Sequence, residues 1–204
     1  MMDKTPIEFF FDFASPYAYL AACRVDAVAA DLGRAVRWRP ILLGAVFKVT
    51  AGQPNLMKPL QGDYLRHDVP RCARRWGIAV AHPLPMPFAS LAASRGFYWL
   101  EGQGGDGHLP PAFARAIFNA HWAEGRDMAL PENVLDVAAG MGIDRDAFEL
   151  GIADAAIKEK LRAETEAAIA RGVFGAPFFM VDGEPFWGAD RLDQMAEWLR
   201  AGGW

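Results

Sequence analysis

The sequence is poor in the residues that build metal sites and disulfide frameworks. It has two cysteines, Cys23 and Cys72, which lie far apart and form no CxxC pattern. Both fall on or near apolar helical faces, so we expect buried thiols. The four histidines show no ligand spacing, which argues against a bound metal; they are His67, His82, His108 and His121.

Long hydrophobic runs and blocks of like charge are also missing. No stretch approaches the roughly 20 uninterrupted apolar residues of a membrane span. The first residues, MMDKTP, contain no charged-then-apolar leader. The net charge of −4 is spread along the chain, which argues against nucleic acid or an anionic membrane as a partner. We therefore expect a cytoplasmic protein that binds neither.

Aromatic residues, in contrast, are plentiful. The 204 residues include seven Trp and fourteen Phe in a hydrophobic fraction of 52%, enough to fill a sizeable core in one domain or two small ones. The densest run lies at residues 7–11, IEFFF, which predicts a strand buried on both faces.

A helix is predicted directly after this strand. Ser15 and Pro16 are a preferred N-cap and a preferred first helical residue, and the apolar spacing carries the helix to Gly33. Ser15 would therefore lie beside unsatisfied N–H groups at the positive end of the helix dipole, a place suited to an anion. The alternative is that Ser15 only caps the helix.

The middle of the chain is predicted to be mainly helical. A second strand covers residues 36–39, and residues 41–62 are predicted to be a loop with at most one short helix. From Asp63 to Gly172 the apolar spacing is helical, with Pro70 placing a kink or a helix start near Asp68. Further helices are expected at 91–100, from 110, at 131–141, after Asp144 and after Asp154.

The last segment returns to strands. Residues 177–181 and 184–187 are predicted to be two strands joined by an Asp182-Gly183 hairpin turn, with Pro185 on an edge strand. Asp190 is predicted to cap a final helix. Pro177 follows Gly175-Ala176, and we predict a cis Ala176–Pro177 bond facing the Ser15 turn, against the more frequent trans form.

The assembled element order is that of an α/β protein with a thioredoxin-like fold and a large inserted all-helical domain. Residues 1–41 and 166–204 would form the thioredoxin-like domain, and residues 42–165 the helical insertion. The turn that holds a CxxC motif in thioredoxins reads Ser15-Pro16-Tyr17-Ala18 here. Disulfide exchange therefore has no nucleophile at this turn.

With this order in place, the chain resembles the 2-hydroxychromene-2-carboxylate isomerases, a family of the DsbA-like superfamily that is related to the kappa-class glutathione transferases. The residues that carry the resemblance are FFFDFASPYAYL at 9–20, PILLGAVFK at 40–48, FARAIFNAHWAEGRDM at 113–128 and FGAPFFMVDGEPFWGADRL at 174–192. Together these segments span nearly the whole chain.

The resemblance implies glutathione as a cofactor and assigns roles to particular residues. It places Ser15 beside the glutathione thiol as the catalytic residue, and the backbone at Ala176, before Pro177, against the cysteinyl part of the tripeptide. Ala189 and Asp190 would lie at the γ-glutamyl end, although Ala189 stands where many relatives have a serine. Two further residues are implied around the substrate: Lys48 and Asn55.

The resemblance also implies the reaction. A glutathione thiolate adds reversibly to the conjugated double bond of an aromatic enone acid, which interconverts 2-hydroxychromene-2-carboxylate and trans-o-hydroxybenzylidenepyruvate in aromatic catabolism. Two alternatives stay open: a kappa-like glutathione transferase that retains the adduct as product, and a non-catalytic glutathione-binding module. The family also implies a homodimer.

Overall fold

A four-stranded mixed sheet forms the centre of the computed structural model, which describes residues 4–82, 84–105 and 107–204. Its strand order is β2-β1-β3-β4; β1 pairs parallel with β2 and antiparallel with β3, and β3 pairs antiparallel with β4. The strands are β1 (Ile7–Phe11), β2 (Val36–Pro40), β3 (Phe178–Val181) and β4 (Glu184–Trp187).

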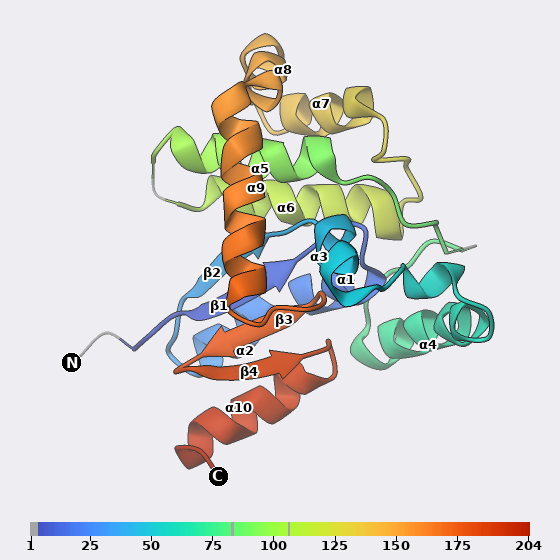
Figure 1. Cartoon of the computed structure of the whole chain (residues 1–204), viewed down its shortest axis with the longest axis vertical. Helices are drawn as coiled ribbons and strands as arrows, with labels where there is room; N and C mark the ends of the chain where they lie inside the picture. The colour runs from blue at the N-terminus through green and yellow to red at the C-terminus, as the bar shows by residue number, and fades with distance from the viewer. Residues whose placement is uncertain (1–3, 83, 106) are drawn as a thin grey trace.

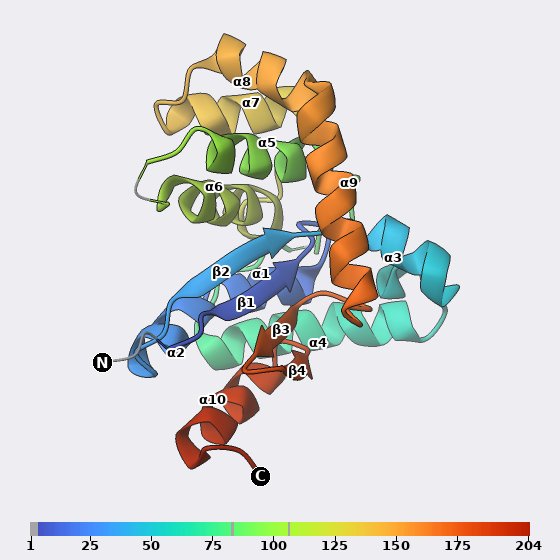
Figure 2. The same ribbon diagram turned by 60° about the vertical axis from the view of Figure 1, so that its left-hand side comes forward.

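Helices cover both faces of the sheet, and further helices lie beyond one of its edges (Figures 1 and 2). The helices of the first half are α1 (Pro16–Ala22), α2 (Val25–Asp31), α3 (Leu43–Thr50), the 3₁₀ turn η1 (Asn55–Met57), α4 (Gln61–Trp76) and α5 (Leu91–Gly102). Those of the second half are α6 (Leu109–Phe118), the π-type turn η2 (Asn119–Ala123), α7 (Pro131–Gly140), α8 (Arg145–Ala153), α9 (Ala155–Ala170) and α10 (Arg191–Ala201).

The phenylalanines of β1 point to both faces of the sheet, as the dense apolar run predicts. Phe9 and Phe11 pack in the main core together with side chains of α1, α2, α10 and the helical insertion. Phe10 faces the other way, into a smaller core with Phe178 and residues of α3 and α9. A strand can be apolar at successive positions only when both of its faces are covered, and both are covered here.

The inserted helices α5 to α8 stack beyond the β2 edge, and α9 runs from that stack back to the sheet (Figures 1 and 2). The stack is closely packed: a Cβ at Gly96 of α5 would lie 2.4 Å from Phe148 of α8. The predicted fold class, a thioredoxin-like sheet with a helical insertion, is confirmed. The predicted domain boundary at 165/166 falls within α9 and stays a prediction.

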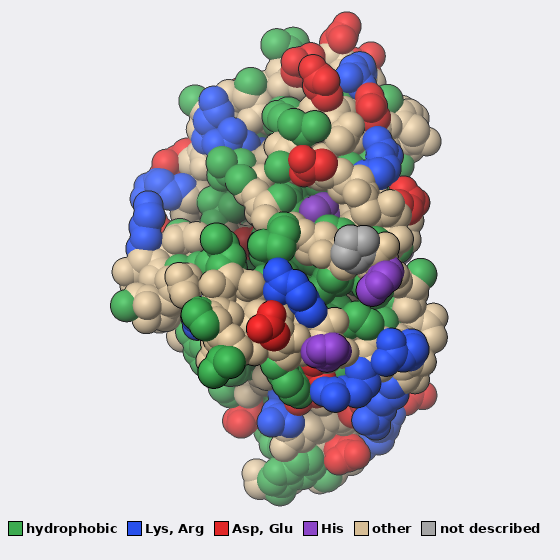
Figure 3. Space-filling view, turned by 90° about the vertical axis from the view of Figure 1, so that its right-hand side faces the viewer, with side chains coloured by type: hydrophobic (Ala, Val, Ile, Leu, Met, Phe, Trp, Pro, Cys, Tyr) green, Lys and Arg blue, Asp and Glu red, His purple; other side chains and the backbone are tan. Residues whose placement is uncertain are grey.

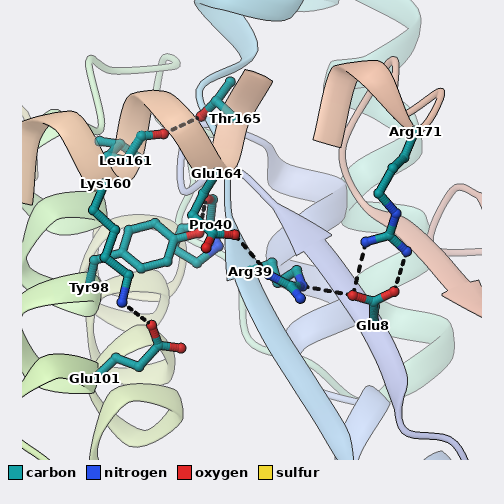
Figure 4. A network of polar contacts seen from close by, with 10 residues as sticks. All are labelled: Glu8, Arg39, Pro40, Tyr98, Glu101, Lys160, Leu161, Glu164, Thr165 and Arg171. Atoms are coloured by element: carbon teal, nitrogen blue, oxygen red, sulfur yellow. Dashed lines mark hydrogen bonds and ion pairs between the residues drawn. The ribbon is translucent and has the colours of Figure 1, made fainter. Parts of the chain in front are cut away.

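Ion pairs fasten α9 and the loop after it to the sheet (Figure 4). Arg39 on β2 donates to Glu8 on β1 and to Glu164 on α9, both at 2.8 Å. Arg171, which follows α9, pairs with the same Glu8 carboxylate. Hydrogen bonding to Arg171 and the charges of both arginines hold the pKa of Glu8 below its usual range, although partial burial works in the opposite direction.

Three predictions about the first half of the chain need correction. The helix predicted from Ser15 to Gly33 is two helices, because Arg24 leaves the helical conformation, stacks on Trp76 and pairs with Asp193. The segment 41–62 contains more helix than predicted, namely α3, η1 and the start of α4. Helix α4 runs through Pro70 without the start near Asp68 that the sequence allowed.

The prediction that both cysteine thiols are buried is wrong for Cys23 and only partly right for Cys72. Cys23 is exposed where α1 ends, whereas Cys72 is half-buried on α4. Position 23 lies two residues from both Ala21 and Val25, so helix spacing turns its side chain away from the apolar face that contains them.

The hairpin predicted near the C-terminus is confirmed. The β3–β4 hairpin turns at Asp182 and Gly183, both with positive φ, as expected for an Asp-Gly pair. Pro185 lies on β4, which is an edge strand, so the hydrogen bond that proline cannot donate is not needed on the outer side.

Candidate functional site

The turn between β1 and α1 places Ser15 beside the C-terminal strands. Ser15 is the N-cap of α1: its backbone is extended, and its Oγ accepts a hydrogen bond from Ala18 N at 3.2 Å. Its backbone N–H donates to Asp12 O at 3.0 Å, which closes the turn. The predicted cap is therefore present.

The hydroxyl of Ser15 also bridges to the far end of the sequence. The Ala176–Pro177 bond is cis, as predicted, and Ser15 Oγ donates to Ala176 O at 2.8 Å. Pro177 O accepts in turn from Gly188 N at 3.1 Å, directly before Ala189 and Asp190. The fold thus gathers into one small region the residues that the sequence pointed to at its two ends.

Asp190 begins α10, but it does not cap the helix with its side chain. The carboxylate is 68% exposed, and it lies 3.4 Å from the guanidinium of the neighbouring Arg191. A Cβ at Gly188 would lie 2.5 Å from Asp190 Oδ1, so the carboxylate lies against the backbone there. The predicted N-cap position is right, and the predicted capping interaction is wrong because Asp190 keeps a helical backbone. Ala189, next to it, is buried.

A polar cluster on α4 contacts the first turn of α1, and no pattern in the sequence predicted it. Tyr17 OH, two residues after Ser15, donates to Asp68 Oδ2 at 2.5 Å. Tyr64, Arg71 and Cys72 also donate to the Asp68 carboxylate. Pairing between residues 51 positions apart has no periodicity that a single sequence could show.

Charges and burial in the cluster shift the titrating groups in opposite directions. Burial, followed by the hydrogen bond to Asp68, raises the pKa of Tyr17 well above its usual range. Burial works to raise the pKa of Asp68, but hydrogen bonds from Tyr17 and Arg71 outweigh it and hold that pKa low. Burial and the charges of Asp68 and Asp190 raise the pKa of Cys72. The Cys72 thiol is therefore not prepared to act as a thiolate.

Two exposed aromatic side chains flank the cis-proline loop. Phe174 and Trp187 are 46% and 52% exposed, and their ring centroids lie 4.8 Å apart. A Cβ at Gly175 would lie 2.4 Å from the Trp187 indole, so only glycine lets the ring lie across the loop. The sequence analysis assigned neither aromatic a role: Trp187 ends a predicted strand, and Phe174 lies before one.

Lys48 and Asn55 lie on the neighbouring α3–η1 segment, and both are exposed. Lys48 is in the last turn of α3, and Asn55 begins η1. Among the described residues no hydrogen bond joins either side chain to Ser15 or Ala176. The first N–H of α3 donates to Asp12 in the turn before Ser15, and the substrate-binding roles of Lys48 and Asn55 stay predictions.

The site is shallow at its centre. Ser15 is only 6% exposed, surrounded by the half-buried Ala14, Tyr17 and Ala176. Two hollows in the described part of the chain lie away from Ser15. One, of about 230 Å³, lies between α3, α5 and α9, and the other, of about 310 Å³, between α2 and α10. Neither contains a residue predicted to bind a ligand, so we place the site by its hydrogen bonds.

The described residues also bear on membranes and metals. None of the described helices is long and apolar enough to cross a membrane. In residues 4–82, 84–105 and 107–204, no group of three or more His, Cys, Asp and Glu side chains could hold a metal ion.

Comparison with known proteins places this chain in a family. The DsbA-like thioredoxin domain family matches residues 6–200. A 2-hydroxychromene-2-carboxylate isomerase of Pseudomonas putida is 35% identical over 189 residues, 91% of this chain and 90% of that protein. The chain belongs to the 2-hydroxychromene-2-carboxylate isomerase family. The predicted resemblance is confirmed, and with it the prediction that the protein is an enzyme of the isomerase class.

The tertiary structure agrees with this family. A solved structure of a 2-hydroxychromene-2-carboxylate isomerase superposes with a TM-score of 0.86 at 33% identity, covering 96% of this chain and 94% of that one. The human glutathione S-transferase kappa 1 is more distant, at 27% identity over 95% of this chain and 90% of that protein.

Proposed function

We propose that the protein is a glutathione-dependent cis–trans isomerase that interconverts 2-hydroxychromene-2-carboxylate and trans-o-hydroxybenzylidenepyruvate, or a related aromatic enone acid. The observation that carries this proposal is the Ser15 hydroxyl, held against the carbonyl of Ala176 across the cis-proline loop. Residues 15 and 18 are Ser and Ala, so the reactive sulfur must come from a ligand rather than from this turn.

The residues around Ser15 fit a γ-glutamyl tripeptide. The exposed Asp190 carboxylate, which lies 3.4 Å from its neighbour Arg191, offers a partner for the ligand's ammonium group. The backbone at Ala176 lies on the loop before β3, where an extended peptide can pair as a further strand does. The buried Ala189 packs beneath this end of the site and leaves binding to backbone atoms and Asp190.

The chain's own residues would orient and stabilise the reacting groups. When bound, glutathione supplies a thiolate that adds reversibly to the conjugated double bond, so that the bond can rotate before the thiolate leaves. A serine hydroxyl has one proton, and Ser15 gives it to Ala176 O in this structure. To donate to sulfur, the hydroxyl must turn away from Ala176. Lys48 would hold the substrate carboxylate, and Asn55 would donate to a carbonyl or phenol oxygen.

The decisive experiment is a spectrophotometric assay with 2-hydroxychromene-2-carboxylate, with and without glutathione. We expect turnover only with glutathione, and no net consumption of it. Consumption of glutathione would favour the kappa-like transferase instead. Glutathione binding without turnover of any enone acid would favour a non-catalytic binding module. The higher identity to the isomerases than to the kappa relatives favours the first outcome.

Calorimetry tests the cofactor separately from the reaction. We expect Asp190→Ala to weaken glutathione binding by about tenfold or more, because a hydrogen bond between charged groups is worth about 1.5–3 kcal/mol. Glu197→Ala, which removes another exposed carboxylate two turns further along α10, is the matched control and should bind like the wild type. Absence of binding to the wild type at millimolar glutathione would refute the cofactor role.

We further propose that the protein acts as a homodimer in the cytoplasm, where thiols stay reduced. Exposed apolar side chains cluster on the α3–α4 segment, and hydrophobic surface is visible on that side of the molecule (Figure 3). Such patches mark interaction surfaces more often than free surface. The patch residues are Val49, Met57, Leu60 and Tyr64, at 59–83% exposure. Light scattering that gave a monomer mass would refute the dimer.

A further inference from the structure

The carboxylate of Asp12 is the buried charged group nearest in sequence to Ser15. It lies one residue beyond β1 and is 3% exposed. Burying a carboxylate is costly unless hydrogen bonds compensate, and three do so here. Asp12 Oδ1 accepts from Ala14 N at 2.9 Å and from Ser90 Oγ at 2.7 Å, and Oδ2 accepts from Leu43 N at 2.7 Å.

The three donors belong to three separate segments. Ala14 lies in the β1–α1 turn, Leu43 is the first residue of α3, and Ser90 directly precedes α5. The carbonyl of Asp12 also accepts from Ser15 N. One residue therefore joins the turn that holds Ser15 to the helix that carries Lys48.

These hydrogen bonds require that both side-chain oxygens of residue 12 act as acceptors. Ala14 N–H and Leu43 N–H can only donate, and they approach different oxygens of the carboxylate. An asparagine has one acceptor oxygen and one donor NH₂ group, so in either orientation its NH₂ would face a backbone N–H. An isosteric amide therefore cannot replace the carboxylate, although it has the same shape.

The Asp12 carboxylate is compensated by hydrogen bonds rather than by a positively charged side chain. Burial raises the pKa of Asp12, and the hydrogen bonds from Ala14, Ser90 and Leu43 oppose that shift. No arginine or lysine is among the groups that contact the carboxylate in the described chain. An apolar residue at this position would leave the N–H groups of Ala14 and Leu43 without this acceptor.

We propose that Asp12 is a positioning residue that sets the location of Ser15 relative to α3, and so relative to Lys48. Its catalytic consequence rests on the function proposed above. Displacement by about 1 Å of groups that orient reactants can cost about 100-fold in rate. Because Asp12 acts through Ser15, its loss can cost no more than loss of the Ser15 hydroxyl itself. We therefore expect Asp12→Asn to lower kcat by about five- to tenfold at saturating glutathione, with the glutathione Kd changed less than about threefold.

Hydrogen exchange measured by mass spectrometry tests the positioning itself and needs no activity. We expect Asp12→Asn to speed exchange in peptides covering both 12–20 and 41–50, and to leave 109–140 and 178–187 as in the wild type. Thr165→Val is the matched control. Thr165 Oγ1 is also buried and accepts from Leu42 N at 3.3 Å, but it reaches the start of α3 from α9 without contacting the Ser15 turn. It should speed exchange at 41–50 alone.

A double mutant separates positioning from general destabilisation. If Asp12 acts through Ser15, then Asp12→Asn in a Ser15→Ala background should lower kcat by less than about threefold, because coupled positions are not additive. A full loss in that background would overturn the proposal. So would faster exchange in only one of the two segments, or equally throughout the chain.

A second variant covers the case in which Asp12→Asn fails to fold. Ser90→Ala removes one of the three donors and leaves the carboxylate, and it should speed exchange in both segments to a smaller extent. Wild-type exchange in both would refute the proposal. If the wild type turns over no enone acid, the proposed function fails, and the exchange measurements alone decide the role of Asp12.

Discussion

Replacing Ser15 by alanine has two consequences that the structure allows to be worked out separately. The first is a loss of stability. The side chain accepts from Ala18 N as the cap of α1 and donates to Ala176 O. A lost cap costs about 1 kcal/mol, and a lost neutral hydrogen bond about 1 kcal/mol more. A total of about 2 kcal/mol lowers the melting temperature of a chain of this size by about 4–8 °C.

The second consequence is a loss of rate, and the Ser15–Ala176 bond limits it. A hydrogen bond to a charged acceptor is worth about 2 kcal/mol and the neutral bond that it replaces about 1 kcal/mol. The net stabilisation of a bound thiolate is then about 1 kcal/mol, or about five- to tenfold in rate. This is smaller than the roughly 10²–10³ that a preorganised oxyanion-hole donor supplies, because Ser15 must first leave another partner.

The assay is steady-state isomerisation and differential scanning calorimetry of wild type and Ser15→Ala at saturating glutathione. Asp144→Ala is the matched control, because Asp144 caps α8 through Ala147 N and lies far from the site in sequence and in the fold. It should melt about 2–4 °C lower, for the loss of one cap, with unchanged kcat. Equal rates for Ser15→Ala and the wild type would show that Ser15 is a cap alone. A loss beyond about 10³-fold would show that it does more than donate a hydrogen bond.

Three further predictions concern packing, pH and substrate binding. Gly96→Ala places a Cβ 2.4 Å from Phe148 and should cost about 1–3 kcal/mol in unfolding free energy, whereas Gly44→Ala, with nothing within 4 Å, should not destabilise; chemical denaturation compares the two. Because two arginines lower the pKa of Glu8, its stabilisation is present above its unfolded pKa and is lost as pH falls through the folded pKa. The melting-temperature gap between wild type and Glu8→Gln should therefore narrow from pH 7 to pH 3, and a constant gap would contradict this. Lys48→Gln should raise KM for the acid substrate and leave the glutathione Kd unchanged; a changed Kd alone would place Lys48 against the cofactor instead.

Local sequence patterns predicted much of this structure because the physics behind them is local. The IEFFF run, the Ser15-Pro16 start and the Asp182-Gly183 turn each depend on neighbours within a few residues, and each is present as predicted. The element order then narrowed the topology to a thioredoxin-like sheet with an insertion, since few connections satisfy it.

Other local patterns misled because distant residues compete with local preferences. The helix predicted after Ser15 breaks at Arg24, whose side chain stacks on Trp76 and pairs with Asp193. The segment 41–62 looked loop-like from its Gly and Pro content, yet α3 forms with its first N–H bound to Asp12. The capping hydrogen bond predicted for Asp190 does not form, because the backbone of Asp190 stays helical.

The candidate site shows the same division. The sequence alone determined which residues occupy the active turn, that no cysteine is among them, and that Gly175-Ala176-Pro177 precedes a strand. Only the tertiary structure decided that Ser15 gives its proton to Ala176, that Tyr17 binds Asp68, and that Asp12 ties three segments together. These contacts join residues 31 to 161 positions apart, and hydrogen bonds of that range form only after the sheet has brought the segments together.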